Sequence, residues 1–122
     1  MDKLIIEARV NEYANRNRNR NVPWLPREIA VDAAQCHDAG ASIVHFHGRD
    51  AQGAPDNSFE ACRDTIVAIR QSSPILIHPS LGYATTSSSF EARFANTRRL
   101  AADAATRPDF VPMDMGSLNV DL

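Results

Sequence analysis

The chain has 122 residues, a normal size for one domain, and its 13 basic and 15 acidic residues nearly balance. This balance lacks the basic excess of nucleic-acid-binding proteins, and no apolar run reaches the ~18 residues that a membrane span needs. We therefore expect no nucleic-acid partner, no membrane span and no signal peptide, and the two cysteines, which lack Cys-x-x-Cys spacing, predict reduced thiols in a cytoplasmic protein.

Strand and helix patterns alternate from the N-terminus. Residues 4–10 are apolar with strand character, and residues 11–26 form a long polar loop. Apolar residues then recur at helical spacing over 27–39, and Gly40 predicts the end of this helix. A second strand is expected at once, over residues 41–47.

The same cycle repeats in the second half of the chain. A turn at residues 50–53 precedes a helix with Phe59, Cys62, Ile66 and Ile69 on one face. The elements expected after it are a strand over 74–79, a helix over 90–101 and a fourth strand over 109–115. Four strands and three helices would account for nearly the whole chain.

This alternation predicts an α/β fold with a parallel sheet and right-handed crossovers. A (β/α)8 TIM barrel and an open doubly wound sheet both fit. No Gly-x-Gly-x-x-Gly follows the first strand, and polar residues gather where strands end, so we favour the barrel. Because a barrel needs about 200 to 250 residues, residues 1–122 are expected to form the N-terminal half of one barrel domain, ending early after the fourth strand.

The second strand ends in a pair of histidines. His45 and His47 are separated by one residue, so their side chains project to the same side of the strand while Phe46 points to the other. Two imidazoles placed in this way can share a divalent metal, but a catalytic zinc site usually takes three protein ligands. The alternative is that both histidines are half-buried and bind loop carbonyls.

The other strand ends are also polar, and each position has a structural alternative. Arg49 and Asp50 can form an ion pair at a turn as readily as part of a site, and His78 can be a hydrogen-bonded interior residue. Loop serines are commonly turn or helix caps, and a loop glutamate is commonly solvated. The candidates in question are Asn11, Glu12, Ser80, Gly82, Asp114, Gly116, Ser117 and Asn119.

One loop has a biased composition. Residues 15–21 alternate asparagine with Arg16, Arg18 and Arg20, on a loop that would overhang the site end of a barrel. Arginine suits carboxylates and phosphates through its planar guanidinium group, so the loop can attract an anionic substrate. Alternating Asn and Arg also describe a solvated loop.

Three segments together resemble a known family. They are Ala39-Gly-Ala-Ser-Ile-Val-His-Phe-His-Gly-Arg-Asp50, then Pro79-Ser80 with Gly82, and Met113-Asp-Met-Gly-Ser-Leu-Asn119. They resemble the β-keto acid cleavage enzymes, a family of zinc-dependent (β/α)8 barrels. The resemblance runs from Leu4 to Asn119, and its motif Gly-Ala-x-x-x-His-x-His-x-Arg-Asp is far more specific than His-x-His alone.

The resemblance implies a zinc-dependent reaction. His45 and His47 would be zinc ligands, completed by a glutamate that lies beyond Leu122. In the family, zinc polarises the keto oxygen of a β-keto acid, which reacts with acetyl-CoA to give a shorter CoA ester and acetoacetate. Acid/base residues of later strands are absent as well, so this chain alone is expected to be inactive or nearly so.

The resemblance also suggests which residues meet the substrate. Ser80 matches a family serine near the substrate carboxylate, and Asn11 and Glu12 lie where family members contact the variable part of the substrate. We assign these three as catalytic residues that also bind substrate, with Gly82, Arg16 and Ser117 as further substrate contacts. The full-length protein is expected to be a homo-oligomer.

Two departures leave the substrate open. Leu81-Gly82-Tyr83 replaces the Thr-Gly-Gly that often follows the family serine, and Pro112 stands where some members have a hydroxyl residue.

Two other functions fit the residues. A metal-dependent hydrolase on a similar barrel usually carries His-x-His at the end of its first strand rather than its second. A non-catalytic half-barrel that only binds a metal or pairs with a partner is favoured by the missing third ligand.

Overall fold

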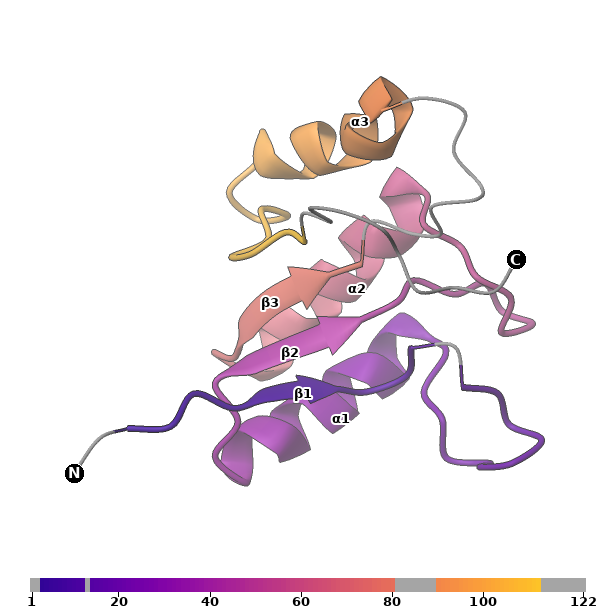
Figure 1. Cartoon of the computed structure of the whole chain (residues 1–122), viewed down its shortest axis with the longest axis vertical. Coiled ribbons are helices and arrows are strands. Elements are labelled where there is room, and N and C mark those ends of the chain that lie inside the picture. Colours follow the sequence, from indigo (N-terminus) through magenta and orange to yellow (C-terminus); the bar gives the residue numbers. More distant parts are fainter. Residues whose placement is uncertain (1–2, 13, 81–89, 113–122) are drawn as a thin grey trace.

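The computed structural model describes residues 3–12, 14–80 and 90–112, with the elements labelled in Figure 1. In chain order they are β1 (Glu7–Arg9), α1 (Pro26–Asp38), β2 (Ile43–Phe46), α2 (Phe59–Ser72), β3 (Leu76–Pro79) and α3 (Phe90–Ala101). The predicted alternation of strand and helix is confirmed over these elements. None of the helices in the described part of the chain is long and apolar enough to cross a membrane.

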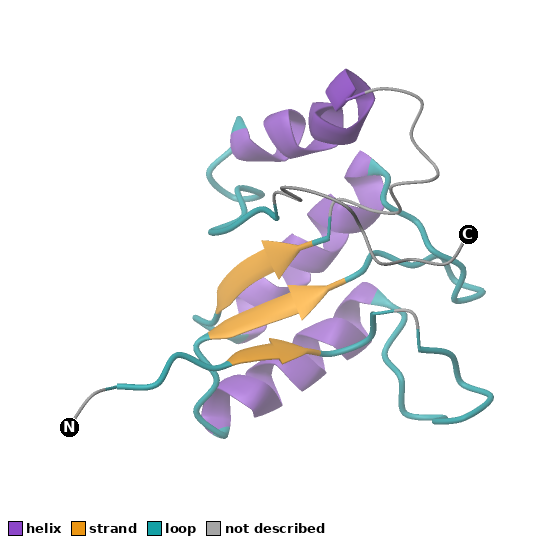
Figure 2. Cartoon of the chain, viewed as in Figure 1, coloured by secondary structure: helices purple, strands orange, loops and turns teal. Residues whose placement is uncertain are grey.

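The three strands form one parallel sheet in the order β1-β2-β3. In its register Arg9 lies beside His45, and His45 lies beside His78. Helices α1 and α2 lie on the same face of this sheet (Figure 2), and both contribute to one hydrophobic core. The α/β class is therefore confirmed, and the strands follow one another across the sheet in the order of the sequence.

The alternation of side chains along β2 and β3 divides the sheet into an apolar and a polar face. Val44, Phe46, Ile75 and Ile77 point to the helices and are at most 1% exposed. Burying each of these side chains contributes about 1.5 to 3 kcal/mol. The opposite face carries Glu7, Arg9, His45, Leu76 and His78. The core therefore fixes the orientation of the histidines by strand parity.

Particular residues explain where α1 begins and where it ends. The carboxylate of Glu28 accepts the backbone N–H groups of Trp24 and Leu25, which satisfies donors that the first turn leaves unpaired. At the other end Gly40 has φ +101°, a left-handed conformation that glycine adopts without strain. The predicted end of this helix is thus confirmed.

The two cysteines behave as unpaired thiols. Cys62 is buried in the core, and Cys36 is partly buried. Burial raises the pKa of the Cys62 thiol to about 12, so this thiol stays protonated and unreactive at neutral pH.

The prediction of a fourth strand over residues 109–115 is wrong for residues 109–112. Residues 109–112 form no strand, and residues 113–115 lie outside the described residues. Asp109 explains the irregular backbone, because its carboxylate accepts the backbone N–H of Ile77 at 2.8 Å in place of a strand carbonyl. The backbone N–H groups of Asp109 and Phe110 both donate to the carbonyl of Ile77. This segment therefore lies beside β3 without the evenly spaced hydrogen bonds of a parallel β-ladder.

Candidate functional site

His45 and His47 meet at the carboxyl end of β2. Both are buried, and their Nε2 atoms lie 3.2 Å apart, a distance that permits a hydrogen bond between the rings. Zinc-to-imidazole bonds of about 2.0–2.1 Å at a tetrahedral angle place two nitrogens about 3.3–3.4 Å apart. The observed separation therefore suits two ligands of one tetrahedral metal ion.

Both imidazoles are uncharged at neutral pH. Burial lowers the pKa of His47 to about 4, with the nearby His45 acting in the same direction. Burial also lowers the pKa of His45, and the neighbouring His78 and Arg9 add to this effect. Neutral imidazole is the form that binds a metal, so the site is electrostatically prepared for a cation without prior loss of protons.

The lowered pKa of His47 predicts a pH-dependent stability for the metal-free protein. His47 binds a proton near pH 6.5 when unfolded but only near pH 4 when folded, so the unfolded state holds more protons between these values. The free energy of unfolding is therefore expected to fall by about 1 to 2 kcal/mol as the pH falls from about 7.5 to about 5. Urea titrations in the presence of chelator measure it, and a His47→Gln variant with an unchanged slope would show that another group is responsible.

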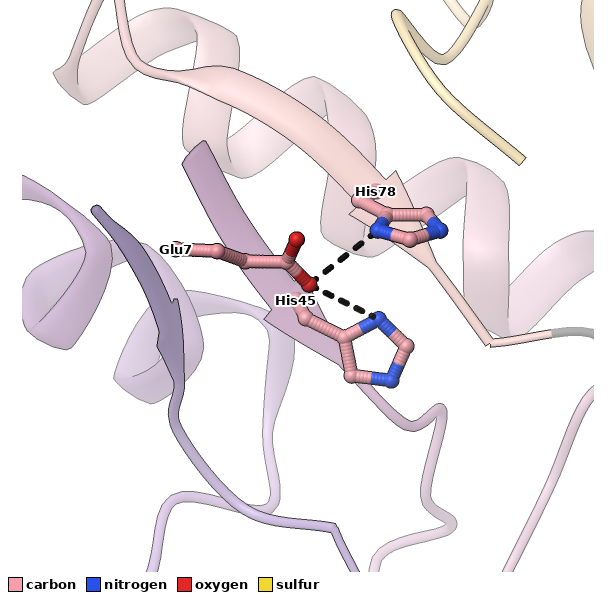
Figure 3. A group of neighbouring side chains, drawn as sticks. All are labelled: Glu7, His45 and His78. Atoms are coloured by element: carbon pink, nitrogen blue, oxygen red, sulfur yellow. Dashed lines mark hydrogen bonds and ion pairs between the residues drawn. The ribbon is translucent and has the colours of Figure 1, made fainter. Parts of the chain in front are cut away.

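A second group of ligand-type side chains shares His45. Glu7, His45 and His78 offer ligand atoms that all lie within 4.8 Å of one another, so together they can hold a metal ion (Figure 3). Glu7 Oε1 lies 3.1 Å from His78 Nδ1 and 3.9 Å from His45 Nδ1. Glu7 had not been identified as a candidate from the sequence, although its parity with Arg9 on β1 places it on the polar face.

Asn11 lies in the site, but its side chain is bound to the backbone. It is 3% exposed, accepts the His47 backbone N–H at 2.9 Å and donates to the His47 carbonyl at 2.9 Å. It also donates to the carbonyl of Pro23 at 3.2 Å. Asn11 thus holds the backbone of a candidate ligand in place and ties it to the loop that follows β1.

Glu12 follows Asn11 and has an unusual backbone conformation. Its φ is +34°, a region that residues other than glycine seldom adopt and that often marks functional sites. Arg9 binds its carboxylate at 2.6 Å, and Arg49 donates to its carbonyl. Its negative charge raises the pKa of His47 slightly, against the dominant effect of burial, so Glu12 lies within electrostatic reach of the histidines.

Arg49 and Asp50 have separate structural roles. Arg49 donates to the carbonyls of Gly53 and Ala14 as well as that of Glu12, which joins the loop after β1 to the loop after β2. The carboxylate of Asp50 instead accepts the backbone N–H groups of Gln52 and Ala54, as in an Asx turn.

The remaining candidates divide into three groups. Ser80 follows β3, and its backbone N–H donates to the Phe46 carbonyl at 2.9 Å, so it lies beside the end of β2. Arg16 donates to Glu28 at 2.6 Å and to the Val22 carbonyl at 2.9 Å, with its guanidinium 4.1 Å above the Trp24 ring. It therefore fastens the loop to the start of α1. Five candidates lie outside the described residues, namely Gly82, Asp114, Gly116, Ser117 and Asn119.

Comparisons with known proteins agree over almost the whole chain. A family model described as beta-keto acid cleavage enzyme matches residues 3–122. A 3-keto-5-aminohexanoate cleavage enzyme of Fusobacterium nucleatum is 35% identical over 121 residues, or 98% of this chain and 42% of the relative. The enzyme of the same name from Acetoanaerobium sticklandii is 33% identical over 121 residues, covering 98% of this chain and 41% of the relative.

A more distant relative has a different name. The 3-dehydrocarnitine:acetyl-CoA trimethylamine transferase of Rhizobium meliloti is 27% identical over 120 residues, which are 87% of this chain and 40% of the relative. The chain thus spans about two fifths of the length of the curated relatives that it matches.

Proposed function

The chain belongs to the β-keto acid cleavage enzyme family, and from this premise we propose that it is part of an enzyme that cleaves a β-keto acid with acetyl-CoA. The products would be a CoA ester of the shortened acid and acetoacetate. The pair of buried, neutral imidazoles with Nε2 atoms 3.2 Å apart carries this proposal. The name of the Rhizobium meliloti relative, which includes acetyl-CoA, supports the same co-substrate.

We propose that His45 and His47 hold Zn2+ through their Nε2 atoms. The spacing of these atoms fits the ion, and both rings are in the metal-binding form. A bound Zn2+ supplies a Lewis acid that polarises a keto oxygen and stabilises the negative charge that develops there when the adjacent carbon-carbon bond breaks. A further protein ligand would come from a part of the protein beyond the residues matched here.

The chain's own residues would prepare the site and receive the substrate. Asn11 fixes the His47 backbone, so in our proposal it positions the ligand rather than contacting substrate. Glu12 follows β1 and Ser80 follows β3, the strands on either side of β2, and both would contact the substrate, with Gly82 and Ser117 as further proposed substrate contacts. Neutral ligands leave the charge of the ion uncancelled, which favours an anionic substrate such as a keto acid.

We further propose that the chain is the first part of a (β/α)8 barrel. The strand order β1-β2-β3 and the placement of α1 and α2 on one face agree with successive strand-helix units of a barrel. In a barrel, the polar face of the sheet would look inward, and the strand ends would open to the site.

The test uses the protein at its natural length, purified without chelator. We expect a stoichiometric zinc content by elemental analysis and consumption of a β-keto acid that requires acetyl-CoA and yields acetoacetate. Turnover without acetyl-CoA would instead identify a metal-dependent hydrolase. Protein that holds no zinc and shows no acetyl-CoA-dependent turnover with a panel of β-keto acids would overturn the proposal.

A further inference from the structure

His45 has two ring nitrogens in different surroundings. Its Nε2 faces the Nε2 of His47, whereas its Nδ1 is buried and has no hydrogen-bond partner among the described residues. The His45 side chain is only 9% exposed, so water cannot readily satisfy the Nδ1 atom. An unsatisfied buried polar atom is rare and calls for an acceptor nearby.

The carboxylate of Glu7 is such an acceptor. Its Oε1 lies 3.9 Å from His45 Nδ1, and His78 Nδ1 holds the same oxygen at 3.1 Å (Figure 3). Glu7 lies on β1 and His78 on β3, so the two residues flank His45 from the neighbouring strands. A shift of about 1 Å in this carboxylate would bring Glu7 and His45 to hydrogen-bond distance.

We propose that Glu7 is the positioning residue for His45 and that His78 holds Glu7 in place, an inference that rests on the proposed zinc site. By accepting the Nδ1–H of His45, Glu7 would fix the tautomer in which the Nε2 lone pair is free for the metal. It would also fix the ring orientation and make Nε2 more basic. Metal-binding histidines generally have such an acceptor on the second nitrogen.

The distances favour this role over direct metal binding by Glu7. A tetrahedral zinc ion with bonds of about 2.0–2.2 Å separates its ligand atoms by about 3.3–3.5 Å. The Nε2 atoms of His45 and His47 are at 3.2 Å, close to that separation, whereas Glu7 Oε1 and His45 Nδ1 are at 3.9 Å. Glu7 also already accepts a hydrogen bond from His78, which leaves its oxygen suited to receive a second one.

The test measures the affinity of the natural-length protein for Zn2+ by chelator competition, together with the visible absorption of its Co2+ form. Glu7→Ala is expected to weaken Zn2+ binding about 10- to 100-fold, the usual effect of losing an acceptor behind a histidine ligand. Glu7→Gln keeps an acceptor oxygen and should restore most of the affinity. His78→Asn should weaken binding by less than about 10-fold, because it loosens Glu7 without removing it.

The Co2+ spectrum separates positioning from ligation. The Glu7→Ala protein, once saturated, should have the spectrum of the unmodified protein, since the ligand set is unchanged. Glu60→Ala, which removes an exposed carboxylate that pairs with Arg99 on the helices, is the matched control for lost negative charge and should bind as the unmodified protein does. The melting temperature of the metal-free protein should be the same in Glu7→Ala and Glu60→Ala.

Two outcomes would overturn the proposal itself, and two others the zinc site beneath it. Glu7→Ala within twofold of the unmodified affinity would show that Glu7 plays no part. Strong loss in Glu7→Gln and His78→Asn, with a changed Co2+ spectrum, would make Glu7 and His78 direct ligands. An unmodified protein that binds no Zn2+, or a His47→Ala protein that binds it normally, would instead refute the proposed zinc site on which this inference rests.

Discussion

His47→Ala is expected to weaken Zn2+ binding by more than about 100-fold, beyond the range for residues that act only behind a ligand. His45→Ala should have an effect at least as large, because it removes the other nitrogen of the pair at 3.2 Å. Both variants should lose acetyl-CoA-dependent cleavage of the keto acid in the same proportion as bound zinc. The measurements are zinc content after gel filtration and turnover of the natural-length protein at saturating substrate.

His37→Ala is the matched control for these variants. His37 lies in the last turn of α1 with a partly exposed side chain, so its removal deletes an imidazole without touching the polar face of the sheet. It should retain full zinc content and turnover. If His47→Ala kept its zinc while His37→Ala lost it, or if both kept it, the assignment of His45 and His47 as ligands would be wrong.

The order of elements could be predicted from sequence because hydrophobic periodicity reflects burial on one face. The ends of the strands could not. The first strand is apolar from Leu4, but β1 begins at Glu7, and Leu4 and Ile5 are 82% and 71% exposed. A strand extends only as far as its neighbour supplies hydrogen bonds, and the ladder with β2 begins at Glu7 beside Ile43. An apolar run in the sequence does not indicate where the pairing with the neighbouring strand begins.

The site was partly predictable for the same reason. The shared orientation of His45 and His47 follows from strand parity alone, which the structure confirms. The approach of Glu7 to His78 depends on the register of β1 and β3 through β2, over a separation of 71 residues. A single glutamate in an apolar strand gives no sign of that register. Sequence therefore predicts the end of the sheet at which the candidate residues gather but does not identify Glu7 as one of them.

Asn11 shows what a sequence pattern leaves open. Its position at a strand end predicted contact with substrate, yet its side chain is 3% exposed and satisfies three backbone groups. A polar residue at a strand end can serve either the substrate or the backbone that carries the ligands. Only burial and hydrogen-bond partners, which depend on the folded loop, distinguish the two.

Asn11→Ala is therefore expected to lower the free energy of unfolding by about 3 to 4 kcal/mol, because it removes the hydrogen bonds that this side chain makes to three buried backbone groups. Urea titration of the metal-free protein measures the change. Zn2+ affinity should fall as well, since the His47 backbone loses both hydrogen bonds that the Asn11 side chain makes to it.

Two further variants separate a backbone role for Asn11 from a substrate role. Asn11→Asp keeps an acceptor for the His47 N–H but cannot donate to the carbonyls of His47 and Pro23, so it should also be destabilised. Asn17→Ala, an exposed asparagine in the loop after β1, should unfold as the unmodified protein does. An Asn11→Ala protein of normal stability and zinc affinity but with a raised KM for the keto acid would show that Asn11 contacts the substrate. If Asn11 instead holds the His47 backbone, its loss should lower both stability and zinc affinity, because the backbone of the ligand loosens before any substrate is bound.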